Sequence, residues 1–460
     1  MESTSKNIDG GWAWVILTCG FFCMFLNGFM CYSVGVITEA LLEEFEGDLA
    51  VTAAVGTSII GIENLLGPFI GIGINIFGCR SCTVFGGVIA MFGLVGASFS
   101  KNLSSMMGTF GIVGGIGYGF GFLPGNVMVG LYFKKLRPIA AGITMAGAGL
   151  GMFVGPPLIR YLIDMYSLQG ALLVIAGIAL HFSVFGCLMR PLKENHNKSK
   201  STSSPRLESQ SCTLLLTKKW TKTKERMGGR CSSRIWKNYG FLLYVLSIFG
   251  WNCAESAVLL HLPNYCIQQG SSKQEAAFLF TIMGVTNVLS RLFTGFAAND
   301  ERVSSLILHM GQMGVASFFT SLFPLYSHAY SGQVVFAAAT GMYIGGVNTL
   351  FTPILFMLLD KEDLALGYGM AYCTAGIGYM TGPPVAGAIV DSGATYTQSY
   401  LFASSMFLLS SMLIMLIPIA QSVDQKLISN MNQDISVNME EEVNEGSRWL
   451  PEQDGSCGSS

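Results

Sequence analysis

The sequence predicts an all-α membrane protein of twelve transmembrane helices, arranged as two halves of six. Three observations predict this fold. Of the 460 residues, 51% are hydrophobic and only 12% are charged, and the mean hydropathy is +0.51, a composition typical of integral membrane proteins. Twelve separate stretches are long enough to cross a bilayer, for which a helix needs about 20 apolar residues. In addition, one short motif recurs at the same place in both halves.

The first half covers residues 13–189 and follows an N-terminal segment, residues 1–12. That segment has no basic cluster, and the apolar run after it is longer than the core of a signal peptide, so we expect no cleaved leader. The six predicted spans of this half are Ala13–Val36, Ala50–Ile72, Cys82–Phe99, Ser105–Leu131, Ile139–Ile159 and Gly170–Met189.

The second half covers residues 239–420 and has the same number of apolar stretches. Its predicted spans are Phe241–Leu262, Ala276–Ala298, Ser304–Phe323, Val334–Leu359, Leu366–Val390 and Tyr400–Ala420.

Two charged segments flank the second half. Residues 190–238 form a predicted linker loop in which Arg190 to Lys237 supply 13 basic and 3 acidic residues, and we expect it to contact anionic membrane lipid. Residues 421–460 contain 8 acidic and 2 basic residues and form a predicted disordered, acidic cytoplasmic tail. Neither segment indicates nucleic-acid binding, because a basic loop beside membrane spans is ordinary for a membrane protein.

The distribution of lysine and arginine predicts the orientation. The loops on one side of the predicted membrane carry most of these residues, besides the linker: Arg80, Lys134, Lys135, Arg137, Arg302 and Lys361. The loops on the other side carry only Lys101, Arg160 and Lys273. Because basic loops stay in the cytoplasm, we expect the first side, the linker and both termini to be cytoplasmic.

A repeated motif indicates a duplicated protein. Residues 148–157 read Ala-Gly-Leu-Gly-Met-Phe-Val-Gly-Pro-Pro, and residues 375–384 read Ala-Gly-Ile-Gly-Tyr-Met-Thr-Gly-Pro-Pro. An aspartate follows seven residues later in each case, at Asp164 and Asp391. Two related halves of equal helix count are typical of transporters whose halves rock around a central cavity. The repeat therefore predicts transport.

Other chemistry has little support in the sequence. No motif pairs a nucleophile with a base and no ATP-binding loop is present, so we expect neither an enzyme nor an ATP-driven pump. Cys79 and Cys82 match C-x-x-C, but without a second pair or a nearby histidine they are weak evidence for a metal site. We expect no metal and no cofactor.

Two further motifs resemble signatures of the monocarboxylate transporter family of the major facilitator superfamily. The first is Asp9-Gly10-Gly11-Trp12-Ala13-Trp14. The second runs from Tyr132 through Phe133, Lys135, Arg137 and Gly142 to Gly147, and departs from the family pattern at Leu136, Ile139 and Thr144. The resemblance implies the major facilitator fold, a plasma-membrane location and a small carboxylate substrate. It also implies a possible single-span ancillary glycoprotein as partner.

We expect these family motifs to serve folding and conformational exchange more than substrate contact. Trp12 and Trp14 fall at the predicted headgroup level, where tryptophan anchors helices. Lys134, Lys135 and Arg137 would hold their loop in the cytoplasm.

Arg291 is the leading candidate for substrate binding, because it is the only charge in Ala276–Ala298. An arginine at bilayer depth costs at least ~2.5–3.5 kcal/mol on insertion scales and usually faces a bundle interior or a watery cavity. The resemblance implies that it binds the substrate carboxylate. The alternatives are a structural ion pair and an arginine that extends to the cytoplasmic interface.

Two positions that handle protons in the family's proton-linked members carry other residues here. Those members place an aspartate four residues before the arginine and a lysine in the first span; the aligned positions here are Asn287 and Val34. Neither side chain titrates. Two intramembrane carboxyls remain, Glu63 and Glu255. We expect Glu63 to be structural, and Glu255 either to neutralise Arg291 or to carry a proton.

The tenth predicted span supplies further candidates for the cavity wall: Tyr343, Val347, Asn348 and Phe351. Members of the family that are confined to short acids place phenylalanine where Val347 stands, so the resemblance implies a roomier pocket here. The sequence as a whole favours a facilitative carboxylate transporter. The alternatives are a proton symporter that uses Glu255 and a receptor or interaction protein that has kept the fold without transport.

Overall fold

The computed structural model describes residues 8–45, 49–191, 235–393 and 395–447. Most of the predicted linker, the first seven residues and the end of the predicted tail lie outside these ranges. Every regular element in the described residues is a helix, so the all-α prediction is confirmed for this part of the chain.

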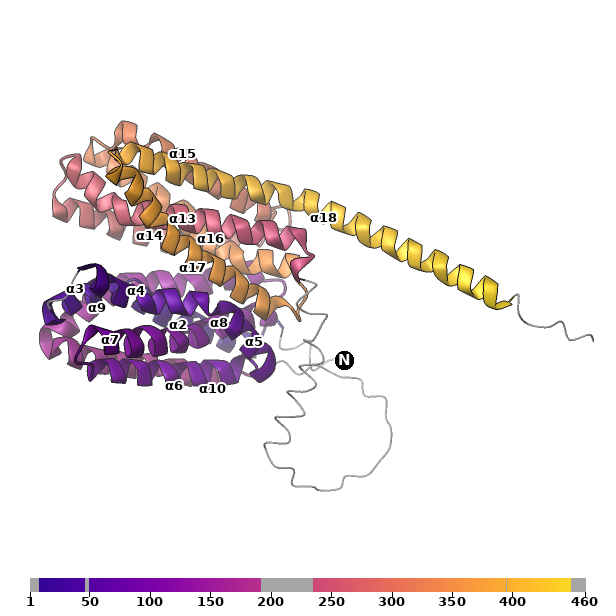
Figure 1. The fold of residues 1–460 in the computed structure, drawn as a ribbon, viewed down its shortest axis with the longest axis horizontal. Helices are drawn as coiled ribbons and strands as arrows, with labels where there is room; N and C mark the ends of the chain where they lie inside the picture. The colour runs from indigo at the N-terminus through magenta and orange to yellow at the C-terminus, as the bar shows by residue number, and fades with distance from the viewer. Residues whose placement is uncertain (1–7, 46–48, 192–234, 394, 448–460) are drawn as a thin grey trace, which may run out of the picture.

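The helices form two bundles that lie side by side (Figure 1). The first bundle contains α2 (Trp12–Cys31), α3 (Val34–Phe45), α4 (Leu49–Leu65), α5 (Gly67–Phe77), α6 (Cys79–Ser98), α7 (Leu103–Met106), the π-helical segment η1 (Met107–Gly114), α8 (Gly115–Tyr132), α9 (Arg137–Ala179) and α10 (His181–Leu188). The second contains α13 (Tyr239–Gln268), α14 (Lys273–Ala297), α15 (Ser305–Tyr326), α16 (Tyr330–Leu358), α17 (Leu364–Asp391) and α18 (Tyr396–Ser447).

Each predicted apolar stretch lies within helical structure, apart from one or two residues at an end or a break, and several helices run on beyond the predicted ends. Nine helices of the described residues are long and apolar enough to cross a membrane, or ten if the bent pair α4 and α5 counts as one span. Local signals set several helix ends. Asn102 and Asn238 accept the N–H of the third residue beyond them, and Ser272 with Glu275 forms a capping box, which satisfies free N–H groups of the first helical turn.

Four breaks interrupt the predicted pattern of one straight helix per span. The α2 helix ends at Cys31 and α3 begins at Val34; α4 and α5 meet at Leu66 with a bend of 50°. The η1 segment follows α7 without a gap, and the last break lies at Leu180, between α9 and α10, inside the sixth predicted stretch. Ser167 inside α9 has φ 61° and falls between the fifth predicted stretch and the sixth.

The acidic C-terminal segment differs from the expectation. We predicted residues 421–460 to be disordered, whereas the α18 helix continues past Ala420 to Ser447 and extends beyond both bundles (Figure 1). The physical reason is that an established helix propagates easily, since only nucleation is unfavourable. Residues 421–445 contain neither glycine nor proline to stop it.

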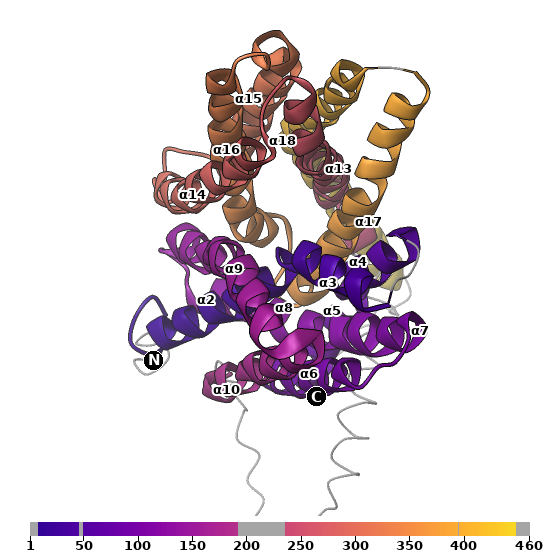
Figure 2. The same cartoon turned by 90° about the vertical axis from the view of Figure 1, so that its left-hand side faces the viewer.

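The two halves meet through α9 against α14 and through α5 against α17, and Figure 2 views these contacts along the bundles. Small residues allow very close approach there. A Cβ atom on Gly142 would lie 2.6 Å from the Arg291 carbonyl oxygen, and one on Gly67 would lie 2.2 Å from the Gly369 carbonyl oxygen. Both contacts lie toward the end of the bundles that carries Lys134, Arg137 and Arg302, which we call the basic end.

Candidate functional site

Arg291 lies on α14 with only 3% of its surface exposed. Its Nε–H donates to Oδ1 of Asn287 at 2.7 Å, and one Nη group donates to the carbonyl oxygen of Met145 on α9. The guanidinium is therefore held between the two halves. This geometry differs from that of an arginine extended to the membrane interface, in which the charged group would be exposed.

The backbone around Arg291 is also fixed. The Thr349 hydroxyl of α16 donates to the Arg291 carbonyl oxygen at 3.1 Å, and Gly142 packs directly against the same oxygen. Asn287 lies one helical turn earlier, so its amide reaches the guanidinium along the helix surface, as residues four apart do. The two groups that accept these hydrogen bonds from the guanidinium, the Asn287 amide and the Met145 carbonyl, offer oxygen atoms without a charge.

A small cavity lies beside this pair. It holds about 20 Å³, room for about one water molecule. Its walls come from both halves: Tyr32, Met152, Glu255, Leu259, Met283, Asn287, Thr340, Gly341 and Ile344. Of the candidates predicted from the sequence, only Asn287 and Glu255 line it.

Glu255 lies on α13 and is 6% exposed. It interacts electrostatically with Arg291, and Tyr379 lies within hydrogen-bonding reach of its carboxyl group. Ion pairs within 4.0 Å among the described residues involve only Arg160, with Glu39 and Asp164. Glu255 and Arg291 therefore share one region without forming the direct pair that was one of the alternatives.

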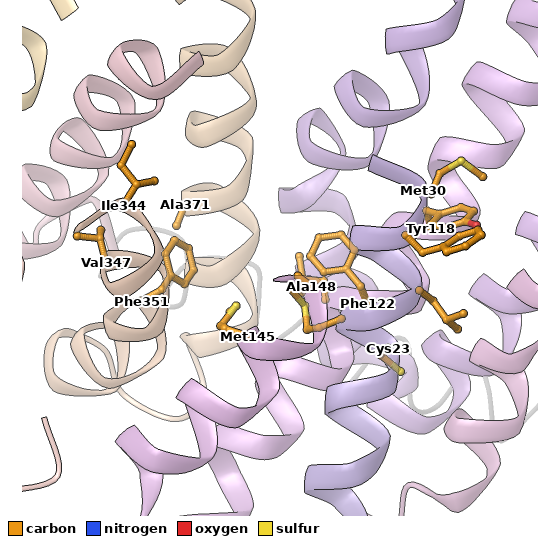
Figure 3. Packing of buried hydrophobic residues seen from close by; sticks show 14 of the residues in the cluster. Cys23, Met30, Tyr118, Phe122, Met145, Ala148, Ile344, Val347, Phe351 and Ala371 are labelled. Atoms are coloured by element: carbon orange, nitrogen blue, oxygen red, sulfur yellow. The ribbon is translucent and has the colours of Figure 1, made fainter. Parts of the chain in front are cut away.

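The tenth-span candidates lie deeper than predicted. Val347 and Phe351 are buried toward the basic end, where the Phe351 ring contacts the Tyr372 ring at 4.9 Å between centroids. Figure 3 shows both side chains in the packed core, across from Met145 and Phe122 of the first half. Asn348 donates to the Ile344 carbonyl at 3.2 Å, and Tyr343 stacks on Phe319.

Helical periodicity explains how the tenth-span candidates relate to the cavity. Thr340, Ile344, Val347 and Phe351 recur every three or four residues and so share one face of α16. Val347 and Phe351, which we predicted to line the cavity, lie farther along this face than Thr340 and Ile344, which do line it. In this structure the cavity touches the first turns of the face, and the halves close over the later ones.

Sequence reasoning missed Tyr32, which lines the cavity from the break between α2 and α3 and lies within hydrogen-bonding reach of Arg291. Tyr32 reaches the cavity because the helix is interrupted at this position. No proline or charged residue in the sequence indicates the interruption. Val34 is buried two residues later at the start of α3. This aliphatic side chain occupies the position that the resemblance assigns to a lysine in proton-linked members.

Glu63 of α4 sits in a separate polar cluster of the first half. It is 3% exposed and accepts hydrogen bonds from the Asn27 amide at 3.1 and 3.2 Å and from the Cys31 thiol at 3.2 Å. It is not among the residues that line the cavity. These contacts support the structural role expected for it.

The two family-like motifs meet at the basic end. The Asp9 carboxylate accepts the backbone N–H groups of Lys134, Lys135 and Leu136 at 2.9 to 3.2 Å. Burial raises the pKa of Asp9, but these backbone hydrogen bonds and the nearby Arg137 charge outweigh it and leave the pKa below its ordinary value. Asp9 and Gly11 both have positive φ, 57° and 56°, and Gly10 lies between them.

Aromatic contacts complete this motif cluster. The Trp12 indole donates to the Leu188 carbonyl at 3.3 Å, the Tyr132 hydroxyl donates to the Arg190 carbonyl at 2.6 Å, and the Arg190 guanidinium lies 3.8 Å above the Trp12 ring. Trp14 meets Phe133 edge-on at 5.7 Å.

Arg137 and Gly147 tie the second motif to the rest of the protein. The Arg137 guanidinium donates to the Phe133 and Gly130 carbonyls and lies 3.8 Å from the Phe356 ring of the second half. A Cβ on Gly147 would lie 2.2 Å from the Phe21 carbonyl oxygen of α2. The motif residues thus pack the first half and touch the second, away from the cavity.

Comparisons with known proteins agree with this architecture. The family model described as "Major Facilitator Superfamily" matches residues 20–352 and 270–434. Human monocarboxylate transporter 14 is 29% identical over 477 residues, covering 91% of this chain and 93% of that protein. Monocarboxylate transporter 2 of Mesocricetus auratus is 27% identical over 406 residues, covering 87% and 83%.

Solved structures show the same fold at low identity. The E. coli fucose:proton symporter superimposes with a TM-score of 0.67 at 14% identity, covering 88% of this chain and 99% of the other. A proton:xylose symporter superimposes with a TM-score of 0.66, also at 14% identity, covering 88% and 95%.

Proposed function

Because this chain belongs to the major facilitator superfamily and is a member of the monocarboxylate transporter family, we propose that it is a plasma-membrane transporter of a monocarboxylate or related carboxylate-bearing metabolite. The observation that carries the proposal is the buried guanidinium of Arg291 between the halves. A guanidinium offers five N–H donors in a geometry that suits carboxylate. Two are used by Asn287 and Met145 among the described residues.

Transport proceeds by alternating access. The small cavity beside Arg291 indicates a state in which the halves have largely closed around the site. Rocking of the halves would open it first to one side and then to the other. The gradients of the substrate set the direction of net movement.

Twelve spans with both termini in the cytoplasm complete the proposal. Ser167 supports a division of the 52-residue apolar segment Arg137–Leu188 into two spans, and α17, with 28 residues, is long enough for another. Epitope tags at the two ends, stained before and after permeabilisation, test the arrangement. Surface staining with and without a co-expressed single-span immunoglobulin-type glycoprotein tests the location and the ancillary partner.

We propose a facilitative mode because Asn287 and Val34 occupy the two positions at which the resemblance expects titrating groups. A second candidate is proton symport, which the position of Glu255 on the cavity wall favours. Uptake of a labelled monocarboxylate such as lactate or pyruvate at two pH values separates the two modes. A facilitative carrier shows no alkalinisation of the medium during uptake, whereas a symporter does.

The central test is Arg291→Ala. Loss of a charged hydrogen-bond partner costs roughly 1.5–3 kcal/mol, so uptake should fall by at least about tenfold at equal surface amount. Arg160→Ala is the matched control, because Arg160 is an exposed arginine whose side chain is 45% accessible and exposed ion pairs contribute little. Full uptake by Arg291→Ala would contradict the assignment of Arg291 to the substrate site. Loss of uptake in Arg291→Ala but not in Arg160→Ala would exclude the alternative of a receptor that does not transport.

A further inference from the structure

Two opposite charges face the same small region without pairing. Glu255 lines the cavity from α13, and Arg291 sits beside it on α14 in contact with the cavity residue Asn287. They interact electrostatically, yet among the described residues no ion pair within 4.0 Å joins them. A buried carboxyl is normally paired directly or neutralised by a proton, and a cationic group of a bound ligand would also satisfy it.

A simple monocarboxylate does not satisfy both groups. Its carboxylate at Arg291 would bring a second negative charge close to Glu255 in a site from which water is largely excluded, where like charges repel strongly. A substrate that carries a cationic amine as well as a carboxylate removes this conflict. The amine would donate to Glu255 while the carboxylate accepts from Arg291.

We infer that the preferred substrate is zwitterionic, a carboxylate metabolite with a cationic amine, whose amine is bound by Glu255. This inference rests on the proposed function, because it takes Arg291 as the carboxylate site. In a state that is open enough to admit it, such a ligand would make a charge-assisted hydrogen bond of about 2.8 Å to each group.

The remaining walls of the cavity suit such a ligand. Leu259, Met283 and Ile344 provide apolar surface for a carbon chain between the two charged ends, and Thr340 adds a hydroxyl group. Binding sites of this type are largely apolar with a few placed polar groups. Because the cavity is small in this state, the chain between amine and carboxylate should be short.

The test compares matched pairs that differ only in the amine: glycine with acetate, β-alanine with propionate, and γ-aminobutyrate with butyrate. Initial uptake of each labelled compound is measured in cells that express the wild type, Glu255→Gln or Arg291→Ala at equal surface amounts. Wild type should take up at least one zwitterion faster than its partner. Glu255→Gln should lower the uptake of that zwitterion by about tenfold or more. Uptake of the matching amine-free acid should stay the same or become faster.

Glu63→Gln is the matched control, since it changes another buried glutamate without touching the cavity wall, and it should leave the ratio within each pair unchanged. Equal loss of both members in Glu255→Gln, together with loss of pH dependence, would identify Glu255 as a proton carrier and overturn the inference while the proposed function stands. A wild type that favours the amine-free acid in every pair, or takes up no compound of the panel, overturns it too. Full uptake in Arg291→Ala contradicts the proposed function itself.

Discussion

Asp9 joins two segments that are about 125 residues apart in the sequence. Its carboxylate accepts three successive backbone N–H groups at the start of the loop before α9, and its own backbone N–H donates to the Tyr132 carbonyl at 3.1 Å. The side chain thus does for this loop what a capping residue does for a helix terminus. The two family motifs are therefore joined by this residue as well as by the contact between Trp14 and Phe133.

Replacing Asp9 should weaken the fold at the basic end. By analogy with the loss of a helix cap, Asp9→Ala is expected to lower the free energy of unfolding by about 1 kcal/mol, measured as a lower thermal midpoint of the purified protein in detergent. Glu44→Ala, which changes an exposed carboxylate whose contact is to Gln169, serves as the comparison. An unchanged midpoint in Asp9→Ala would show that the loop is held by other contacts.

The same residue predicts a pH dependence. The pKa of Asp9 is lower in the folded protein than its ordinary value, so its contribution to stability is fully present above the ordinary pKa and is lost as the pH falls through the folded pKa. The difference in thermal midpoint between wild type and Asp9→Asn should therefore be constant near neutral pH and shrink in acid. A difference that grows in acid would contradict this account.

At this scale the sequence predicted part of the candidate site. A lone charge in an apolar stretch identified Arg291, and the spacing of four residues placed Asn287 beside it. Tyr32 and Tyr379 could not be predicted, because tyrosines are common in membrane helices and their positions here depend on a helix break and on the packing of α17. The roles of all these residues in binding stay predictions.

Among the elements, α9 and α14 make one of the close contacts between the halves. Gly142 and Gly295 face each other there: a Cβ on Gly295 would lie 2.9 Å from the Pro138 carbonyl and 3.2 Å from the Gly142 Cα. Such small-residue contacts let helix backbones approach within a membrane. They also leave no space for a larger side chain.

Gly142 substitutions should therefore reduce transport in proportion to size. Overpacking costs about 1–3 kcal/mol, so Gly142→Ala should lower uptake several-fold and Gly142→Leu by about tenfold or more, at equal surface amount. Gly177→Leu is the matched control on the same helix, because nothing lies within 4 Å of a Cβ there. Equal effects of Gly142→Leu and Gly177→Leu would mean that the close contact does not matter for transport.

Helix positions were predictable from the sequence, whereas only some helix interruptions were. Apolar runs of about 20 residues specify where helices form, since the backbone in lipid must satisfy its own hydrogen bonds. The bend at Leu66 directly precedes Gly67-Pro68, a pair that commonly ends or kinks a helix. The break at Tyr32 has no such signal, because several conformations satisfy the same apolar composition there and tertiary packing decides between them. The length of α18 was underestimated because acidic composition was taken to indicate disorder.

For the molecule as a whole, the repeated Ala-Gly-x-Gly and Gly-Pro-Pro motif was the informative signal. It predicted two related halves, and the family model together with the solved symporter structures bears out the major facilitator fold. The conformational state could not be predicted, because one sequence must adopt several. The roles of the α16 candidates in binding stay predictions, since Val347 and Phe351 are buried in this state.

The bond from Arg291 to the Met145 carbonyl crosses from the second half to the first, and this has a kinetic consequence. Under the proposed function, the guanidinium fastens the halves together in the empty carrier, and a carboxylate that draws Arg291 toward itself would weaken the bond to Met145. The loaded carrier should then reorient faster than the empty one. Efflux of preloaded substrate should accelerate when the same substrate is present outside, and equal efflux with and without it would show that this bond does not limit the return step.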